Sequence, residues 1–187
     1  MAALATLGHS RTSEPGLAEP ALVHDDLVHA THALRALVAF ERQPSAAMQS
    51  GALRDELELV RRRVLAALSM RHGTDGLNRV AFQLAQRNPR SHALALEWLD
   101  VTLTGTDRAV VALLEPGLSD RERLNALRGH CAVGLLSQQE LLIDLVHDGE
   151  DRWRRPWIKA CALYTASGMS EIDLEALAAA VGDGPAT

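Results

Sequence analysis

Apolar residues recur at intervals of three and four along most of this chain, which is the spacing of one face of an α-helix. In the segment 52–71 this stripe consists of Leu53, Leu57, Val60, Val64, Leu65 and Leu68. Comparable stripes predict helices over 21–42, 75–87, 89–103, 107–114, 119–130, 137–147, 156–167 and a last segment that begins at Ser170. The pattern therefore predicts an all-α chain of about nine helices.

Two serines mark helix starts. Ser119 and Ser137 each precede an apolar run, and a glutamate, Glu122 or Glu140, follows three residues later. In this arrangement, a capping box, the serine hydroxyl accepts a hydrogen bond from an unpaired backbone amide and the glutamate reaches back to the serine. We expect a new helix at each serine.

The clearest unit is the segment 140–169, which reads as helix, charged corner and helix. Pro156 opens the second helix, where its missing N–H removes no hydrogen bond. Trp157, Ala160, Cys161 and Tyr164 share one face of that helix. We expect this face to be buried, with Ala160 in a close contact with another helix.

Short connections and a weak repeat suggest how the helices are arranged. Pro89 and Ala93 line up with Pro156 and Ala160 at an offset of 156 − 89 = 67 residues, which leaves room for two further helices between them. This corresponds to roughly 33 residues per helix pair, as in helical solenoids. We expect stacked antiparallel helix pairs with the first helix as an N-terminal cap; an irregular helical bundle is the alternative.

Composition fits a single helical domain. The 187 residues are 47% hydrophobic but only 3% aromatic, and the net charge is −5, which gives no global attraction to nucleic acid. We expect a leader over 1–20, a domain over 21–181 and a tail over 182–187. No apolar run approaches the roughly 18 residues of a transmembrane helix. Cys131 and Cys161 sit in apolar helical contexts, so we expect buried free thiols and a cytoplasmic location, with tethering to a membrane domain left open.

One helix face carries a candidate metal site. Asp25, His29 and His32 lie four and three residues apart, so one face of the first helix presents a carboxylate and two imidazoles. Such a set can bind a divalent metal ion when a further ligand is supplied from elsewhere. The alternative is a solvated polar face.

Arginines form two candidate partner-binding clusters. Arg61, Arg62 and Arg63 span most of a helical turn, so they cannot all face one ligand. The residues of the other cluster, in the charged corner, are Arg152, Trp153, Arg154 and Arg155. Trp153 is expected to be an exposed anchor for a protein partner, whereas Trp98 and Trp157 are expected to pack between helices.

Catalytic signatures are missing from the sequence. It has no Gly-rich phosphate loop, no CxxC, no HExxH and no GxSxG. Glu97 and Asp100 lie one turn apart and could act as an acid–base pair if buried, but pairing with arginines of a neighbouring helix is favoured. We therefore expect no enzyme activity and no cofactor.

The corner and its flanking helices resemble a HEAT-type repeat. The segment 145–169, LVHDGEDRWRRPWIKACALYTASGM, has the apolar helix, the Asp-bearing corner and the Ala- and Leu-rich second helix of that repeat. The segments 157–164 and 95–100 are similar to a soluble HEAT-like region of bacterial transporters of the ATP/ADP-translocase and major-facilitator type. The resemblance covers about 55–169, without membrane helices or a nucleotide-binding β-roll. It implies a cytosolic scaffold or coupling domain.

The expected function is therefore a non-enzymatic scaffold or regulatory module that binds a protein partner. A small-molecule or metal-binding helical sensor is the alternative.

Overall fold

The structure, a computed structural model, describes residues 19–86, 88–129, 134, 136–148, 152–153, 155–169, 172–173, 175 and 177. These residues form eight α-helices, two short 3-10 helices and no β-strand, which confirms the all-α class. The α-helices are α1 (Glu19–Phe40), α2 (Ala47–His72), α3 (Thr74–Ala85), α4 (Pro89–Thr102), α5 (Ala109–Leu114), α6 (Asp120–Leu127), α7 (Gln138–His147) and α8 (Pro156–Ser167), and the 3-10 helices are η1 (Pro44–Ala46) and η2 (Gly105–Arg108).

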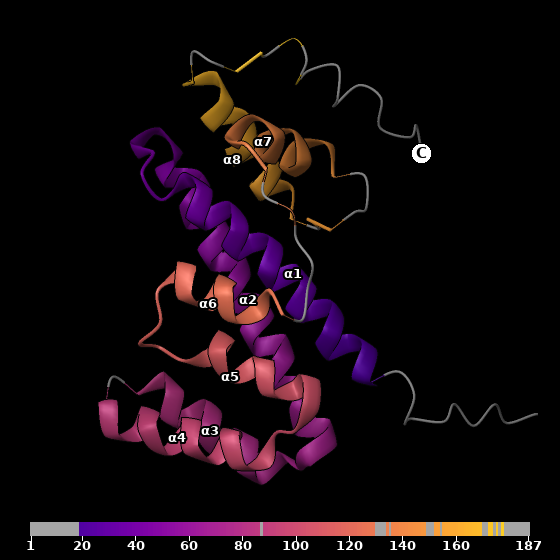
Figure 1. Cartoon of the computed structure of the whole chain (residues 1–187), viewed down its shortest axis with the longest axis vertical. Helices are drawn as coiled ribbons and strands as arrows, with labels where there is room; N and C mark the ends of the chain where they lie inside the picture. Colours follow the sequence, from indigo (N-terminus) through magenta and orange to yellow (C-terminus); the bar gives the residue numbers. More distant parts are fainter. Residues whose placement is uncertain are drawn as a thin grey trace, which may run out of the picture.

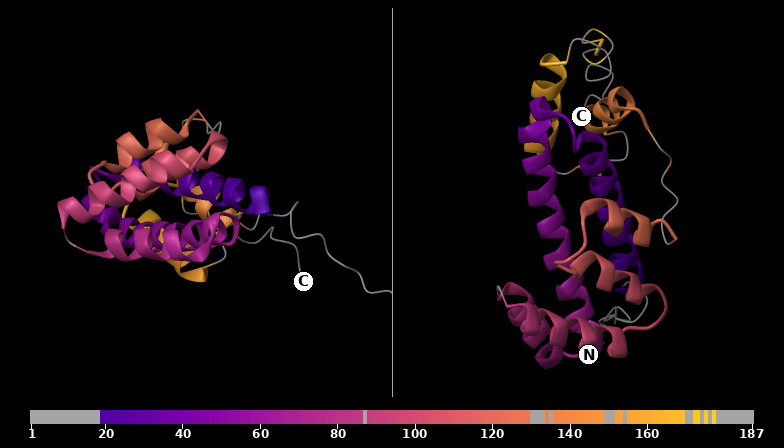
Figure 2. Two further views of the ribbon diagram at one scale, coloured as in Figure 1. Left: turned by 90° about the horizontal axis from the view of Figure 1, so that it is seen from below. Right: turned by 60° about the vertical axis from the view of Figure 1, so that its left-hand side comes forward.

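A long hairpin of α1 and α2 forms the spine of the molecule (Figures 1 and 2). Pro44 opens η1 between the two helices, at the predicted break. α2 has 26 residues, and at 1.5 Å per residue it is about 39 Å long. Its buried positions include Leu53, Leu57, Val60 and Val64, the predicted stripe. The hairpin therefore offers a continuous apolar seam on which the shorter helices pack.

The predicted helix starts are confirmed. Ser119 and Ser137 each accept a hydrogen bond from the backbone N–H of Glu122 and Glu140, whose carboxylates accept from the serine backbone N–H in return. Both are complete capping boxes, so α6 and α7 begin where the sequence indicates. Asn88 caps α4 by accepting from the backbone N–H of Arg90.

Three helix pairs lie in chain order along the spine (Figure 1). α3 and α4 pack at the C-terminal end of α2, α5 and α6 contact α1 in the middle, and α7 and α8 pack at the hairpin turn. The expectation that the first helix is a terminal cap is wrong, because α1 contacts α2, α5, α6 and α7. The contacts between pairs run largely through the spine, so successive solenoid stacking is not confirmed.

Trp98 packs α4 against α3. The indole is partly buried against the core, as predicted. It lies so close to Gly76 that a Cβ built on this glycine would come within 2.5 Å of an indole ring carbon. Leu77 and Val80 of α3 are buried on the same apolar seam. The α3–α4 pair is thus joined by shape and apolar contact.

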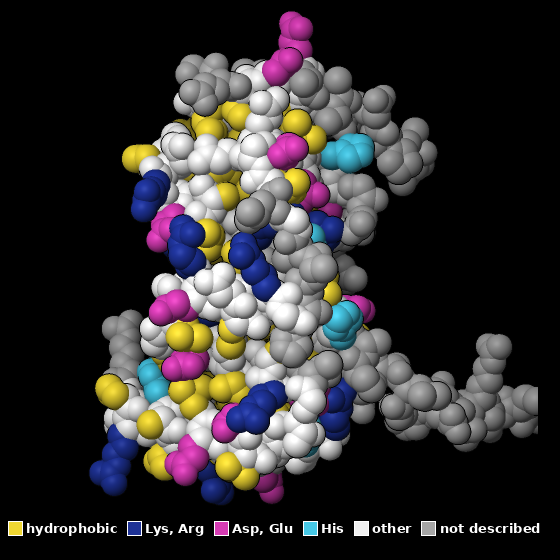
Figure 3. Space-filling model, in the orientation of Figure 1, with side chains coloured by type: hydrophobic (Ala, Val, Ile, Leu, Met, Phe, Trp, Pro, Cys, Tyr) yellow, Lys and Arg dark blue, Asp and Glu magenta, His cyan; other side chains and the backbone are white. Residues whose placement is uncertain are grey.

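Among the described residues, two features are absent: a helix that could span a membrane and, on the face drawn in Figure 3, a large patch of one charge. None of the helices that they form is both long and apolar enough to cross a lipid bilayer. On the face drawn in Figure 3, Lys and Arg side chains are interspersed with Asp and Glu, so no large patch of one charge covers it. Cys161 is buried as a free thiol, as expected, and burial raises its pKa.

Some predictions fall outside the described residues. They are residues 1–18 of the leader predicted over 1–20, the tail over 182–187, most of the ninth helix, and Cys131 and Arg154. α1 itself begins at Glu19, two residues before the expected start.

Candidate interaction surface

Asp148 builds the corner between α7 and α8. It ends α7 in the left-handed region, with φ 43° and ψ 49°. Its carboxylate accepts hydrogen bonds from the backbone N–H groups of Arg152 at 2.7 Å and Trp153 at 2.9 Å, and Lys159 Nζ lies 3.2 Å from it. One buried carboxylate therefore fixes the path of the chain from α7 into α8.

That path directs Trp153 into the core. The indole is only 1% exposed and is among the largest fully buried side chains. Its ring centroid lies 5.0 Å from that of His29, with the ring planes tilted by 54°. The expectation of an exposed tryptophan anchor at this position is therefore wrong, because Asp148 turns the corner inward and Trp153 packs on α1.

Glu56 is the centre of a buried ionic network beneath this corner. Its side chain is 3% exposed, and Oε1 lies 3.0 Å from His29 Nε2. Arg63 and Arg155 lie 3.9 Å and 3.8 Å from its carboxylate. The hydrogen bond with His29 lowers the pKa of Glu56, an effect that burial opposes and the two arginines assist. The carboxylate is therefore an ionic link between α1, α2 and the start of α8.

A second group of charges joins α1 to α7. Arg35 donates to Asp144 Oδ2 at 3.2 Å, and Arg152 donates to the same oxygen at 3.4 Å. His32 lies next to them, and its pKa is lowered to about 4. Burial is the largest cause, and the charges of Arg152, Arg35 and His29 add to it. His32 is therefore neutral at pH 7.

The proposed metal ligands are not brought together. Asp25 is exposed, His29 is bound to Glu56, and His32 is partly buried beside two arginines. The part of the chain that the structure describes holds no cluster of three or more His, Cys, Asp or Glu side chains suited to a metal ion. The helical spacing places the three residues on α1, but their surroundings differ: Asp25 faces solvent, and His29 is hydrogen-bonded to Glu56.

The arginines of the corner have different roles. Arg152 contacts Asp144 and its side chain is mostly buried, so it belongs to the structural network. Arg155 is about half-exposed and lies beside Glu56 at the start of α8. Of the corner residues that were predicted to bind a partner and that the structure describes, Arg155 is thus the one whose side chain reaches solvent most.

The outer face of α8 is apolar. α8 buries Ile158, Cys161, Ala162, Thr165 and Ala166. Trp157, Leu163 and Tyr164 are instead 55%, 41% and 61% exposed, and Ala160 is exposed between them. The expectation that Trp157 and Ala160 pack between helices is wrong: the buried face is centred on Ala162 and Thr165, roughly a quarter turn or more away.

Aromatic side chains are rare in this chain, which has three Trp, one Tyr and two Phe. Trp157 and Tyr164 lie on the same side of α8, since they are seven residues, or about two turns, apart. Trp and Tyr are also the residues that most often dominate protein–protein binding energy. We refer to Trp157, Ala160, Leu163 and Tyr164 as the α8 face.

Sequence reasoning missed the buried charges. Glu56 falls inside the apolar stripe of α2, between Leu53 and Leu57, and a charge within such a stripe is a signal of a buried ion pair.

The candidate acid–base pair on α4 is not buried. Glu97 is exposed, and Asp100 pairs with Arg108 at 2.6 Å, in line with the preferred pairing for Asp100.

Comparisons with known proteins find no match: no family model, no curated protein and no solved structure matches the chain.

Proposed function

We propose that this protein is an interaction module that binds a protein partner through the α8 face. The single observation that carries the proposal is the exposure of Trp157, Leu163 and Tyr164 on one side of a helix whose other side is anchored. An exposed apolar cluster of this kind is a frequent mark of a protein contact. The hydrogen bonds and ion pair of Asp148 in the corner between α7 and α8 support this role, because they hold the α8 face in a fixed orientation.

The charges beside the face indicate the partner's chemistry. Arg155 and Lys159 lie next to it at the start of α8 and both reach solvent. A partner with an apolar centre and an acidic edge would complement them. A second copy of this chain would bring the same positive charges into the contact, which disfavours self-association.

A more specific form of this role is a HEAT-like coupling domain of a transporter. It rests on the resemblance of the segments 145–169 and 95–100. The α8 face would then contact the transporter's membrane part or a further domain. A second protein carrying membrane helices, captured through the α8 face, would support this form.

The test is capture from a lysate of the source cells with the immobilised full chain. We expect a specific protein to bind the wild type and to be lost with the double variant Trp157→Ser, Tyr164→Ser. The matched control is Phe82→Ser, which removes an aromatic side chain that is 66% exposed on α3. This control should keep the partner, and circular dichroism should show that both variants are folded.

Three results would contradict the proposal. The partner could survive the double variant, or the control could lose it equally, or no protein could bind the wild type specifically. Sedimentation of the purified chain adds a fourth: a dimer that the double variant dissociates would make the occupant a second copy.

A further inference from the structure

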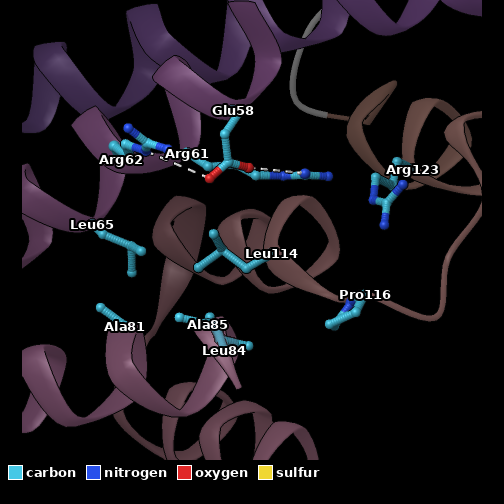
Figure 4. Close-up of a pocket in the computed structure, with 10 residues that line it drawn as sticks. All are labelled: Glu58, Arg61, Arg62, Leu65, Ala81, Leu84, Ala85, Leu114, Pro116 and Arg123. Atoms are coloured by element: carbon cyan, nitrogen blue, oxygen red, sulfur yellow. Dashed lines mark hydrogen bonds and ion pairs between the residues drawn. The ribbon is translucent and has the colours of Figure 1, made fainter. Parts of the chain in front are cut away.

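A pocket of about 390 Å³ opens between α2, α3, α5 and the start of α6 (Figure 4). Its walls include Leu65 of α2, Ala81 and Leu84 of α3, and Leu114 of α5. In Figure 4 these side chains lie below the arginines and point into a common space. The volume suits a small ligand, and these walls suit an apolar one.

The upper edge of the pocket is charged. Arg61 and Arg62 of α2 flank Glu58, whose carboxylate oxygens lie 3.5 Å and 3.6 Å from their nearest nitrogens. Glu58 is half-exposed, so these ion pairs are weak. Arg61 Nε donates to the carbonyl of Leu113 at 3.0 Å, which fixes its guanidinium over the pocket.

Arg123 adds a third, buried guanidinium. Its side chain is 9% exposed; it donates to the Glu115 carbonyl at 2.6 Å and to Asp120 Oδ1 at 3.3 Å. Its Nε has no hydrogen-bond partner among the described residues. Burial lowers the pKa of Arg123, and the nearby charge of Arg61 lowers it further. The two guanidiniums therefore repel each other, and an anion between them would relieve this repulsion.

The charged side chains indicate the class of ligand. Three guanidiniums and one carboxylate, that of Glu58, line the pocket, and Asp120 and Glu115 act on Arg123 from beside it. The unpartnered Nε of Arg123 can donate to an anionic oxygen, and because these carboxylates offset much of the positive charge, one carboxylate suits the pocket better than a doubly charged phosphate. Guanidiniums also bind carboxylates through paired, charge-assisted hydrogen bonds.

We propose that this pocket binds a small monocarboxylate with an apolar tail. The carboxylate lies against Arg61 and Arg123, and the tail lies on Leu65, Ala81 and Leu114. This site is independent of the α8 face, which lies at the other end of the spine.

The first test is isothermal titration of the wild-type chain with three probes at pH 7.5. Octanoate carries both features, octan-1-ol lacks the charge and acetate lacks the tail. We expect octanoate to bind and each of the other two to bind at least about tenfold more weakly, since a charge-assisted pair or several buried methylenes are lost. Amide NMR shifts caused by octanoate should be confined to the helices around the pocket.

Variants then locate the site. Ala81→Leu should fill the pocket and abolish binding without disturbing the fold, because Ala81 faces open space in it. Arg61→Gln should weaken octanoate binding at least about tenfold and leave octan-1-ol unchanged. The matched control is Arg108→Gln, which removes a positive charge outside the pocket lining and should bind as the wild type does.

Several results would overturn the proposal. One is the absence of octanoate binding to the wild type in the millimolar range, and another is an affinity of octan-1-ol equal to that of octanoate. Retention of wild-type affinity by a folded Ala81→Leu variant would place any binding elsewhere. A melting curve for each variant separates loss of the site from loss of the fold.

Discussion

The two ends of the spine hold their helix pairs by different means. At the hairpin turn, buried charges add to the apolar contacts of α7 and α8: Glu56 joins α2 to α1 and to the start of α8, and Asp144 joins α7 to Arg35 of α1. At the opposite end, α3 and α4 meet through apolar side chains and the close fit of Trp98 on Gly76. Buried charges require defined partners and directions, whereas apolar contact requires only complementary shape. The α7–α8 end should therefore respond to pH and the α3–α4 end to side-chain volume.

The largest expected effect distinguishes the two tryptophans of the corner. Trp153→Ala should lower the free energy of unfolding by about 3 to 5 kcal/mol, because a fully buried indole leaves a cavity. Trp157→Ala should change it by less than about 1 kcal/mol, because that side chain is 55% exposed. Urea unfolding measures both. Equal losses in the two variants would mean that the corner does not direct Trp153 inward.

The next effect is that of the buried carboxylate. Glu56→Gln should lower the free energy of unfolding at pH 7 by about 2 to 3 kcal/mol, since Arg63 and Arg155 lose their counter-charge and the buried hydrogen bond to His29 is weakened. The control Glu58→Gln removes a half-exposed carboxylate from the same helix and should change it by no more than about 0.5 kcal/mol.

The pH dependence of Glu56→Gln has a definite sign. The folded-state pKa of Glu56 lies below its ordinary value of 4.5, so its stabilisation is complete above pH 4.5 and is lost as the pH falls through the folded-state pKa. The difference between the wild type and Glu56→Gln should therefore shrink below pH 4.5. A difference that stays constant from pH 7 to about pH 3 would show that the ionic network adds nothing.

The smallest effect concerns the α3–α4 end. Gly76→Ala should destabilise the protein by about 1 kcal/mol, because displacement of Trp98 outweighs the gain in helix propensity. Gly51→Ala, in α2, meets nothing within 4 Å and should stabilise by about 0.5 to 1 kcal/mol. Thermal melts should move in opposite directions. A stabilising Gly76→Ala would mean that the indole is not held tightly there.

The sequence predicted helix ends better than helix faces. Ser119, Ser137 and Asn88 cap helices and Pro156 opens one. These effects are local, so they can be read from a few residues. The face of α8 is different, because the helix is apolar almost all round and its periodicity does not select a side. Only the helices that pack on it determine that Ala162 is buried and Ala160 is exposed.

Long-range pairing explains the remaining differences. Trp153 was expected at the surface because it lies in the corner between two helices, but its burial depends on Asp148 and on His29, which is 124 residues away in sequence. The pocket likewise combines Arg61, Leu84 and Arg123, from three helices that no local pattern connects. Of the candidate site residues, spacing could group those on one helix but could not identify their partners on another.

The position of Glu56 in the chain also matters during synthesis. Glu56 is synthesised 99 positions before Arg155, and His29 still earlier. The surface of α1 and α2 that α8 later covers is therefore exposed while much of the chain is synthesised. A wholly apolar surface would be prone to aggregation with other nascent chains throughout that interval. Because charged side chains form part of the surface that α8 covers, that part favours contact with water until α8 packs on it.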